Sequence, residues 1–178
     1  ILFLIKSKED EASDMSLKKY WKLIQSVFKE HVKWLIAVFI IGAILMFILF
    51  GFLFYLSSIL EDDYKFEGVI KGLLLAIPLL ALSLASYISG KKIKDNLVVM
   101  KWVTFIGIVI VGVSVALIPF LKTPLYLLSI FFICGIGIGI SLPSLDALIT
   151  KSLDKSVRGS ITSIYSAMRF IGVAAGPP

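Results

Sequence analysis

Long apolar stretches without charge constrain this chain more than any other feature of its sequence. The longest, from Trp34 to Leu60, contains no Asp, Glu, Lys or Arg. It exceeds the roughly 20 residues with which an α-helix crosses the hydrocarbon core of a bilayer. Hydrophobic residues make up 58% of the chain and charged residues 17%, whereas about 25% of the residues of a soluble domain are charged. The excess apolar surface requires lipid to cover it, so we predict an all-α membrane protein.

Five stretches of the chain are predicted to be membrane spans. They comprise residues 34–60, 72–89, 102–121, 125–149 and 159–178. Each is longer and more continuously apolar than a strand of a membrane barrel, in which about 9–11 residues alternate in polarity. Only Lys122, Thr123 and Pro124 separate the third span from the fourth, so these two must be antiparallel neighbours. Residues 34–178 are therefore predicted to form a polytopic helical bundle.

Residues 6–33 form a long hydrophilic stretch before the first full span. Within it apolar and aromatic residues such as Trp21, Ile24 and Phe28 recur at helical spacing, with lysines between them. This pattern predicts a basic amphipathic helix, and its Trp, Tyr and Lys content suits the boundary between water and lipid. We interpret it as a linker on the membrane surface, with a calmodulin-type target segment as the alternative. Residues 1–5 are predicted to be the end of an earlier membrane helix, and we expect the chain to be a fragment of a longer one.

The positions of the basic residues predict which side of the membrane each loop faces. Alternate loops carry fourteen Lys and Arg residues on one side, seven in residues 6–33, four in 91–101 and three in 151–158. The other side carries three, Lys65, Lys71 and Lys122. Because positive residues in short loops stay in the cytoplasm, loop 6–33 is predicted to be cytoplasmic and the protein to be a multi-pass protein of the plasma membrane.

The charged and reactive residues exclude several classes of function. The net charge of +6 comes from lysines that sit in short clusters between apolar stretches, so membrane topology explains it better than binding to nucleic acid. The single cysteine, Cys134, lies in an apolar stretch and is interpreted as a packing residue. No pairing of a nucleophile with a base, metal-ligand cluster or phosphate-binding loop occurs, so we predict no enzyme, no metal site and no cofactor.

A short motif near the end of the chain carries a resemblance to a known family. Arg158-Gly159 is followed by Gly172, Gly176 and Pro177, which match the pattern G-x-x-x-G-P. The chain resembles the drug-efflux branch of the major facilitator superfamily, in which a cytoplasmic Arg-Gly precedes a helix with this antiporter motif. In that family the motif lies on the fifth helix, whose partner in the repeated second half is the eleventh.

The resemblance implies an architecture and a function. The chain is expected to be part of the C-terminal six-helix half of a major facilitator fold, working with an N-terminal half by alternating access. The expected function is proton-coupled efflux of small amphipathic or drug-like molecules, driven by the proton gradient. An importer or uniporter of a small metabolite on the same fold, and a non-transporting membrane domain of a sensor, are the alternatives.

Two charged residues within predicted spans are candidates for transport. Arg169 lies ten positions into the fifth span, roughly 15 Å deep, where a charge needs a partner or a wet cavity. Its interpretations are anion binding, membership of a proton-linked charge network, or a structural role. Asp146 is predicted to pair with Arg158 or Arg169, either as proton carrier or as a salt bridge near the membrane surface.

Two further sets of residues are predicted from the sequence. Gly90 and Asp95 form a basic cytoplasmic loop that resembles a loop motif of the family, although their spacing is one residue longer than the motif. Pairs of small residues four positions apart are predicted to let helices approach closely in lipid. These pairs are Gly172 and Gly176, Gly135 and Gly139, and Ser86 and Gly90.

Overall fold

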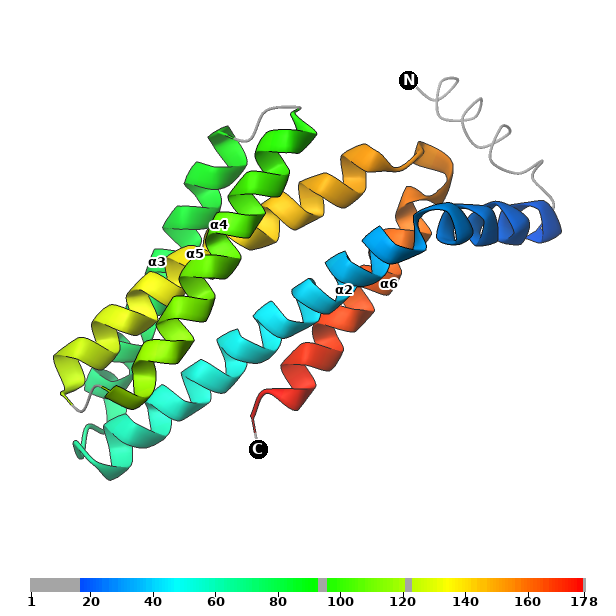
Figure 1. Cartoon of the computed structure of the whole chain (residues 1–178). Coiled ribbons are helices and arrows are strands. Elements are labelled where there is room, and N and C mark those ends of the chain that lie inside the picture. Colours follow the sequence, from blue (N-terminus) through cyan, green and yellow to red (C-terminus); the bar gives the residue numbers. More distant parts are fainter. Residues whose placement is uncertain (1–16, 93–95, 121–122, 178) are drawn as a thin grey trace, which may run out of the picture. The chain divides into compact units, whose positions relative to one another are not determined.

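The computed structural model describes residues 17–92, 96–120 and 123–177, and in these ranges the regular structure is entirely helical. The α-helices are α2 (Leu17–Asp62), α3 (Gly68–Lys92), α4 (Leu97–Leu117), α5 (Pro124–Ser152) and α6 (Lys155–Ala175), and a short 3-10 helix, η1 (Ile118–Phe120), follows α4 (Figure 1). The predicted all-α fold class is confirmed. The prediction for residues 1–5 lies outside the described residues.

The chain divides into two compact units, the first ending at Ala37 and the second running from Val38 to Pro178. The described part of the first unit is the beginning of α2. His31 interrupts the regular geometry of this helix, with φ of −115° and ψ of 17°. The described part of the basic amphipathic segment is therefore helical and is separated from the first apolar stretch by a kink at His31, and the assignment of residues 6–33 to a linker stays a prediction.

Four helical segments of the described chain are long and apolar enough to cross a membrane. They are His31–Asp62, Gly68–Lys92, Leu97–Phe120 and Pro124–Ser152. They contain or closely overlap the first four predicted spans. Helix α6 forms where the fifth span is predicted, but its hydroxyls and the cations Lys155, Arg158 and Arg169 make it less apolar. A membrane-spanning role for residues 159–178 stays a prediction.

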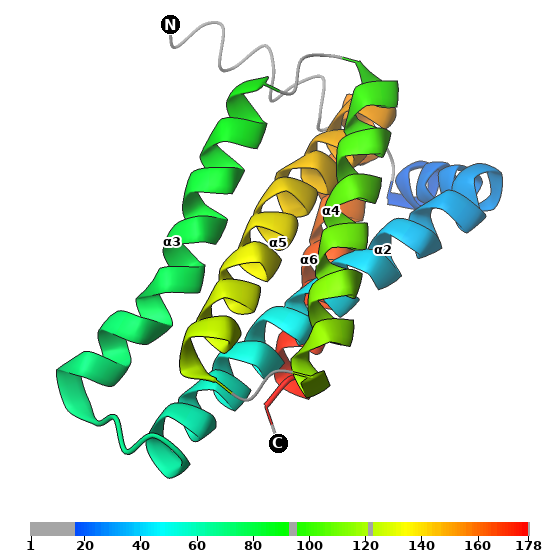
Figure 2. The ribbon, with the colours of Figure 1, turned by 60° about the vertical axis from the view of Figure 1, so that its left-hand side comes forward.

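Helix α5 is the central helix of the second unit, with α3 and α4 packed against it (Figure 2). Its glycines make this packing close. A Cβ atom at Gly139 would lie 2.4 Å from the Leu82 carbonyl oxygen on α3, and one at Gly137 would lie 2.9 Å from the Gly107 carbonyl oxygen on α4. The Ser86 hydroxyl donates a hydrogen bond of 2.9 Å to the Gly139 carbonyl. The helices are thus held by backbone contact and hydroxyl bonds, as expected in lipid.

The second member of the predicted pair Ser86 and Gly90 does not take part in this packing. Gly90 is exposed, and no atom lies within 4 Å of the position that its Cβ would occupy. It also lies inside α3, which continues to Lys92, so the prediction that Gly90 belongs to a loop is wrong. The helix extends this far because Lys91 and Lys92 follow, and basic side chains stabilise the last turn of a helix. Asp95 lies outside the described residues.

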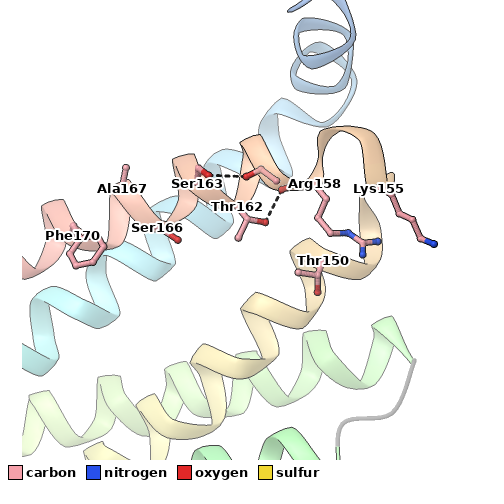
Figure 3. A pocket seen from close by; sticks show the side chains of 9 residues that line it. Thr150, Lys155, Arg158, Thr162, Ser163, Ser166, Ala167 and Phe170 are labelled. Carbon is pink, nitrogen blue, oxygen red and sulfur yellow. Dashed lines mark hydrogen bonds between the residues drawn. The ribbon is translucent and has the colours of Figure 1, made fainter. Parts of the chain in front are cut away.

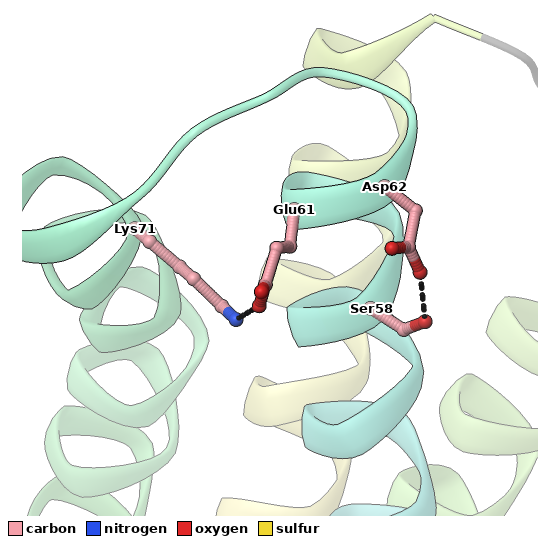
Figure 4. A network of polar contacts seen from close by, with 4 residues as sticks. All are labelled: Ser58, Glu61, Asp62 and Lys71. Carbon is pink, nitrogen blue, oxygen red and sulfur yellow. Dashed lines mark hydrogen bonds and ion pairs between the residues drawn. The ribbon is translucent and has the colours of Figure 1, made fainter.

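Polar contacts fix the ends of several helices. The Asn96 side chain accepts hydrogen bonds from the backbone of Val98 and Val99 and caps the start of α4. At the connection from α2 to α3, Lys71 forms an ion pair with Glu61, and the Ser58 hydroxyl donates to Asp62 at 2.8 Å (Figure 4). Glu61 belongs to α2 and Lys71 to α3, so this ion pair joins the two helices beside their connection.

Candidate functional site

An ion pair joins α5 to α6. The Arg169 guanidinium lies 3.4 Å from the Asp146 carboxylate, at which distance it donates a long hydrogen bond. The side chains are 25% exposed for Arg169 and 49% exposed for Asp146. Of the two partners predicted for Asp146, the structure selects Arg169. Within the described chain, both side chains are thus only partly covered.

The aromatic ring of Tyr165 packs against the guanidinium of Arg169. Tyr165 precedes Arg169 by four positions on α6, where two side chains share one face of a helix, and the guanidinium lies 5.6 Å from the centre of its ring. Tyr165 is 1% exposed, and its hydroxyl lies near both Asp146 and Arg169 without forming a hydrogen bond of regular geometry to either. The buried ring therefore makes a cation–π contact with the Arg169 guanidinium.

A glycine of α2 makes room for this ring. A Cβ atom at Gly42 would lie 2.5 Å from a ring carbon of Tyr165 and 3.0 Å from its hydroxyl oxygen. The ring of Phe39, one turn earlier on α2, lies 6.1 Å from that of Tyr165. Gly42 and Tyr165 were missed as site residues, although the spacing of Tyr165 and Arg169 was a signal that the sequence contained.

A hollow of about 220 Å³ lies beside Arg169. Its other lining residues are Met46 of α2 and Ser166, Phe170 and Val173 of α6. The wall therefore combines one cation and one hydroxyl with thioether, aromatic and aliphatic surface. Such a mixture is typical of sites for small organic molecules, in which a few polar groups orient a ligand against an apolar lining.

A second, larger and more open hollow, of about 680 Å³, lies over the beginning of α6 (Figure 3). Lys155 and Arg158 stand at one end of it together with Thr150 of α5, and hydroxyl residues of α6 continue towards Phe170. Arg158 donates a hydrogen bond of 3.1 Å to the Leu153 carbonyl, and its predicted pairing with Asp146 does not occur. Arg158 also lies within α6, which begins at Lys155, and α5 ends at Ser152, so only Leu153 and Asp154 of the predicted loop 151–158 lie outside helices.

The glycines of the predicted antiporter-like motif face α2. A Cβ at Gly172 would lie 2.1 Å from the Ala43 carbonyl oxygen, and one at Gly176 would lie 3.0 Å from the Gly51 nitrogen. The two glycines thus let the backbones of α6 and α2 touch. In the described chain α6 runs to Ala175, and Pro177 follows two residues later.

The site brings together some of the predicted residues and not others. Asp146 and Arg169 meet directly, and Gly172 lies one turn after Arg169 on α6. Arg158 lies about three turns before Arg169 on α6, while Gly90 belongs to α3. Among the described residues, no group of three or more His, Cys, Asp or Glu side chains comes together.

Comparison with known proteins identifies the family. Residues 1–177 match the model of the Major Facilitator Superfamily. The chain is 44% identical over 175 residues to the bacillibactin exporter of Bacillus subtilis (strain 168), a match that covers 98% of this chain and 44% of that protein. The chain thus spans less than half the length of this relative, and no solved structure matches it. The predicted family resemblance is confirmed: the chain belongs to the major facilitator superfamily of multi-pass membrane transporters.

Proposed function

We propose that the chain is part of the C-terminal half of a proton-driven exporter of small amphipathic molecules. The similar protein of Bacillus subtilis is named as an exporter of bacillibactin, which favours outward transport of a small organic molecule of that kind. The antiporter-like glycines Gly172 and Gly176 on α6 favour the same direction. Their position, expected for the eleventh helix of the family, supports assignment to the second half.

The observation that carries the proposal is the ion pair between Asp146 and Arg169. Proton coupling requires a group whose protonation changes what another part of the protein binds or contacts. A proton on Asp146 removes its negative charge and weakens its attraction to Arg169. Because the residues lie on α5 and α6, proton uptake would change the contact between these helices and leave the Arg169 cation without its counter-ion.

In the proposed cycle, this half rocks against the other half so that a cavity opens to each side of the membrane in turn. Proton entry from outside provides the driving force. Helices α6 and α2 are in close contact at Gly172 and Gly176, and in the proposed cycle these two helices move together. The basic segments at residues 6–33, 91–101 and 151–158 are proposed to face the cytoplasm.

The experiment uses inside-out membrane vesicles that contain the complete transporter. Respiration pumps protons into the lumen of these vesicles. The vesicles are then expected to accumulate an amphipathic dye, and dissipating the pH gradient should release it. Asp146→Asn should abolish accumulation because the residue can no longer take up and release a proton. Lys71→Gln is the matched control, since it breaks the ion pair with Glu61 at the other end of the bundle.

Each other outcome contradicts a stated part of the proposal. Accumulation that persists in Asp146→Asn at the wild-type rate would exclude Asp146 as the coupling residue. Accumulation only in right-side-out vesicles would indicate an importer. Equilibration that is indifferent to the gradient would indicate a uniporter, and the absence of any transport by correctly inserted protein would favour a sensor domain.

A further inference from the structure

Two cations stand at one end of the larger hollow, over the beginning of α6 (Figure 3). Lys155 is exposed, and Arg158 is half-buried. Among the described residues, no carboxylate forms an ion pair with either side chain, and the described lining of the hollow includes no acidic residue. This end of the hollow therefore presents positive charge, to which an anion is attracted.

A single hydrogen bond holds the Arg158 guanidinium in place. One of its terminal nitrogens donates to the Leu153 carbonyl at 3.1 Å, while its Nε atom has no hydrogen-bond partner among the described residues. A carbonyl group leaves the charge of the guanidinium unneutralised, and a guanidinium has five N–H donors. Arg158 thus contributes both charge and unused donors to the hollow that it lines.

The wall beyond the two cations suits the body of an organic molecule. The hydroxyls of Thr162 and Ser163 donate to backbone carbonyls one turn earlier on α6, at 2.8 and 2.9 Å, so these donors are already used. Ala167 and Phe170 supply apolar surface. The hollow, of about 680 Å³, lies in the size range of sites for small organic ligands. Its charge and its apolar wall together fit an amphipathic anion.

The larger hollow lies next to the smaller one, because Ser166 and Phe170 line both. Arg158 lines the first and Arg169 the second, and these residues are eleven positions apart on α6, about 16 Å along the helix axis. The two hollows therefore follow one another along this helix. Lipid tails are a poor cover for such a surface, because a cation deep in hydrocarbon is costly, so water and a polar ligand suit it better.

We propose that the larger hollow is the cytoplasmic entrance for a substrate that carries a negative charge, which Lys155 and Arg158 capture there. The inference rests on the proposed function, in which residues 151–158 face the cytoplasm and transport is outward, and it specifies the charge of the substrate. Opposite charge in a cleft raises the local concentration of a ligand and speeds its association. The smaller hollow lies farther along α6 in the outward direction. Capture itself involves no change of protonation, so it is compatible with proton exchange elsewhere in the cycle.

Charge-selective labelling of a cysteine in the hollow tests the inference without transport. Ser163 is exposed and lines the hollow. The complete protein is placed in nanodiscs with Ser163→Cys as its only cysteine, in a background that includes Cys134→Ala. The reagents are two methanethiosulfonates of similar size, the anionic sulfonatoethyl and the cationic trimethylammonioethyl compound. Each rate is divided by the rate of the same reagent with a free thiol in solution, so that the ratio of the two reports the electrostatic potential in the hollow.

The normalised rate is expected to be higher for the anionic reagent, on the order of tenfold at low ionic strength, and the preference should vanish in about 1 M salt, which screens the charges. Lys155→Gln should lower the ratio about threefold, since one of two charges is removed, and Lys155→Glu should abolish the preference. Lys92→Gln is the matched control and should leave the ratio unchanged. It removes an exposed lysine on the proposed cytoplasmic side that does not line the hollow.

Protection from labelling tests the class of substrate. Anilinonaphthalene sulfonate and phenylnaphthylamine have the same aromatic body, but only the first carries an anion. The sulfonate is expected to protect Ser163→Cys from the neutral reagent methyl methanethiosulfonate at an about fivefold lower free concentration than the amine, as expected for a partly exposed charge pair. Lys155→Gln should reduce this difference, and Lys92→Gln should not. Empty nanodiscs give the correction for binding of the probes to lipid.

Three results would overturn the inference. A normalised rate of the anionic reagent no higher than that of the cationic one would mean that the hollow carries no positive potential. No reaction with either reagent would mean that lipid or another part of the complete protein covers the hollow, because the reactive form of a thiol is the thiolate, which does not form in oil. Equal protection by the two probes would mean that charge does not select the occupant. Since no step involves transport, capture of an anion can stand while proton-driven accumulation fails, or the reverse.

Discussion

The α-carbon of Gly172 on α6 faces the carbonyl of Ala43 on α2 so closely that an added methyl group would lie 2.1 Å from the carbonyl oxygen. The obstacle is backbone, which cannot rotate away as a side chain can. Gly172→Ala is therefore expected to force α6 and α2 apart and to destabilise the protein by about 1–3 kcal/mol, the usual cost of overpacking. Equilibrium unfolding of the purified protein in mixed micelles measures the change.

Gly159→Ala is the matched control for this prediction. Gly159 lies on the same helix, and no atom lies within 4 Å of the position that its Cβ would take. Since alanine favours a helix over glycine by up to about 1 kcal/mol, this substitution should be neutral or stabilising. Equal destabilisation by the two substitutions would show that the close contact of α6 with α2 does not exist in the folded protein.

A second prediction concerns Tyr165, whose ring contacts the Arg169 guanidinium. Its ring is buried, and its hydroxyl forms no hydrogen bond of regular geometry, although Asp146 and Arg169 lie near it. Tyr165→Phe should leave stability unchanged or raise it by up to about 1 kcal/mol, because an unsatisfied buried polar group is removed. Tyr165→Ala should cost about 3 kcal/mol through the cavity that it leaves. Thermal unfolding of the two variants measures the difference.

A large loss of stability in Tyr165→Phe would contradict this reasoning, because it would mean that the hydroxyl has a partner in the complete protein. Gly42→Ala provides an independent check from the other helix. A methyl group there would meet the Tyr165 ring at 2.5 Å, so this substitution should disturb binding or transport that depends on Arg169 even though Gly42 carries no functional group.

The existence of the helices followed directly from the sequence, because helix-length stretches without charge have few other ways to be buried. The ends of the helices did not. Gly90 was predicted as a loop residue and Arg158 as the last residue of a loop, yet both lie inside helices. Charged residues mark where a chain leaves the lipid, but a helix can continue into water for another turn, and hydropathy does not register that continuation.

The candidate site was predicted in part. Asp146 and Arg169 were found because charges in apolar stretches are costly, and the glycine pairs because small residues four positions apart allow close packing. The role of Gly42 could not be found in this way, since it depends on which residue of a distant helix lies opposite. Met46 was missed for the same reason: its apolar character is shared by most of α2.

A third prediction concerns the direction in which the helices cross the membrane. Asp63 lies in the connection that precedes α3, Lys92 is the last residue of α3, and both are exposed. In a variant of this chain in which the single buried cysteine, Cys134, is replaced by alanine, cysteines introduced at Asp63 and at Lys92 should differ in labelling. A membrane-impermeant maleimide applied to intact cells should modify only the first, because Lys92 belongs to the basic, cytoplasmic side.

Permeabilised cells provide the control, since both cysteines should then react. Lys155 offers a second position on the side of Lys92 and should behave like it. Labelling of positions 63 and 92 from the same side in intact cells would contradict the proposed topology, because a single helix that spans the bilayer cannot present both ends to the same compartment.

The last prediction separates a structural from a functional role of the ion pair. A partly exposed pair contributes about 1 kcal/mol or less to stability, whereas breaking a fully desolvated pair costs about 3–5 kcal/mol. In the described chain, Arg169 and Asp146 are 25% and 49% exposed, and we predict that the pair belongs to the first class in the complete protein as well. Asp146→Asn, Arg169→Gln and the double variant should therefore all fold, with a coupling energy of about 1 kcal/mol or less in a double-mutant cycle.

Transport measured on the same three variants completes this test. If the pair exists for function, the variants should lose proton-driven accumulation while their unfolding transitions stay close to that of the wild type. A coupling energy of about 3 kcal/mol or more, with transport restored once both charges are removed, would instead identify the pair as a structural link between α5 and α6. Evolution would then retain the two charges to hold the helices together, and the proton would have to be carried by another residue of the complete transporter.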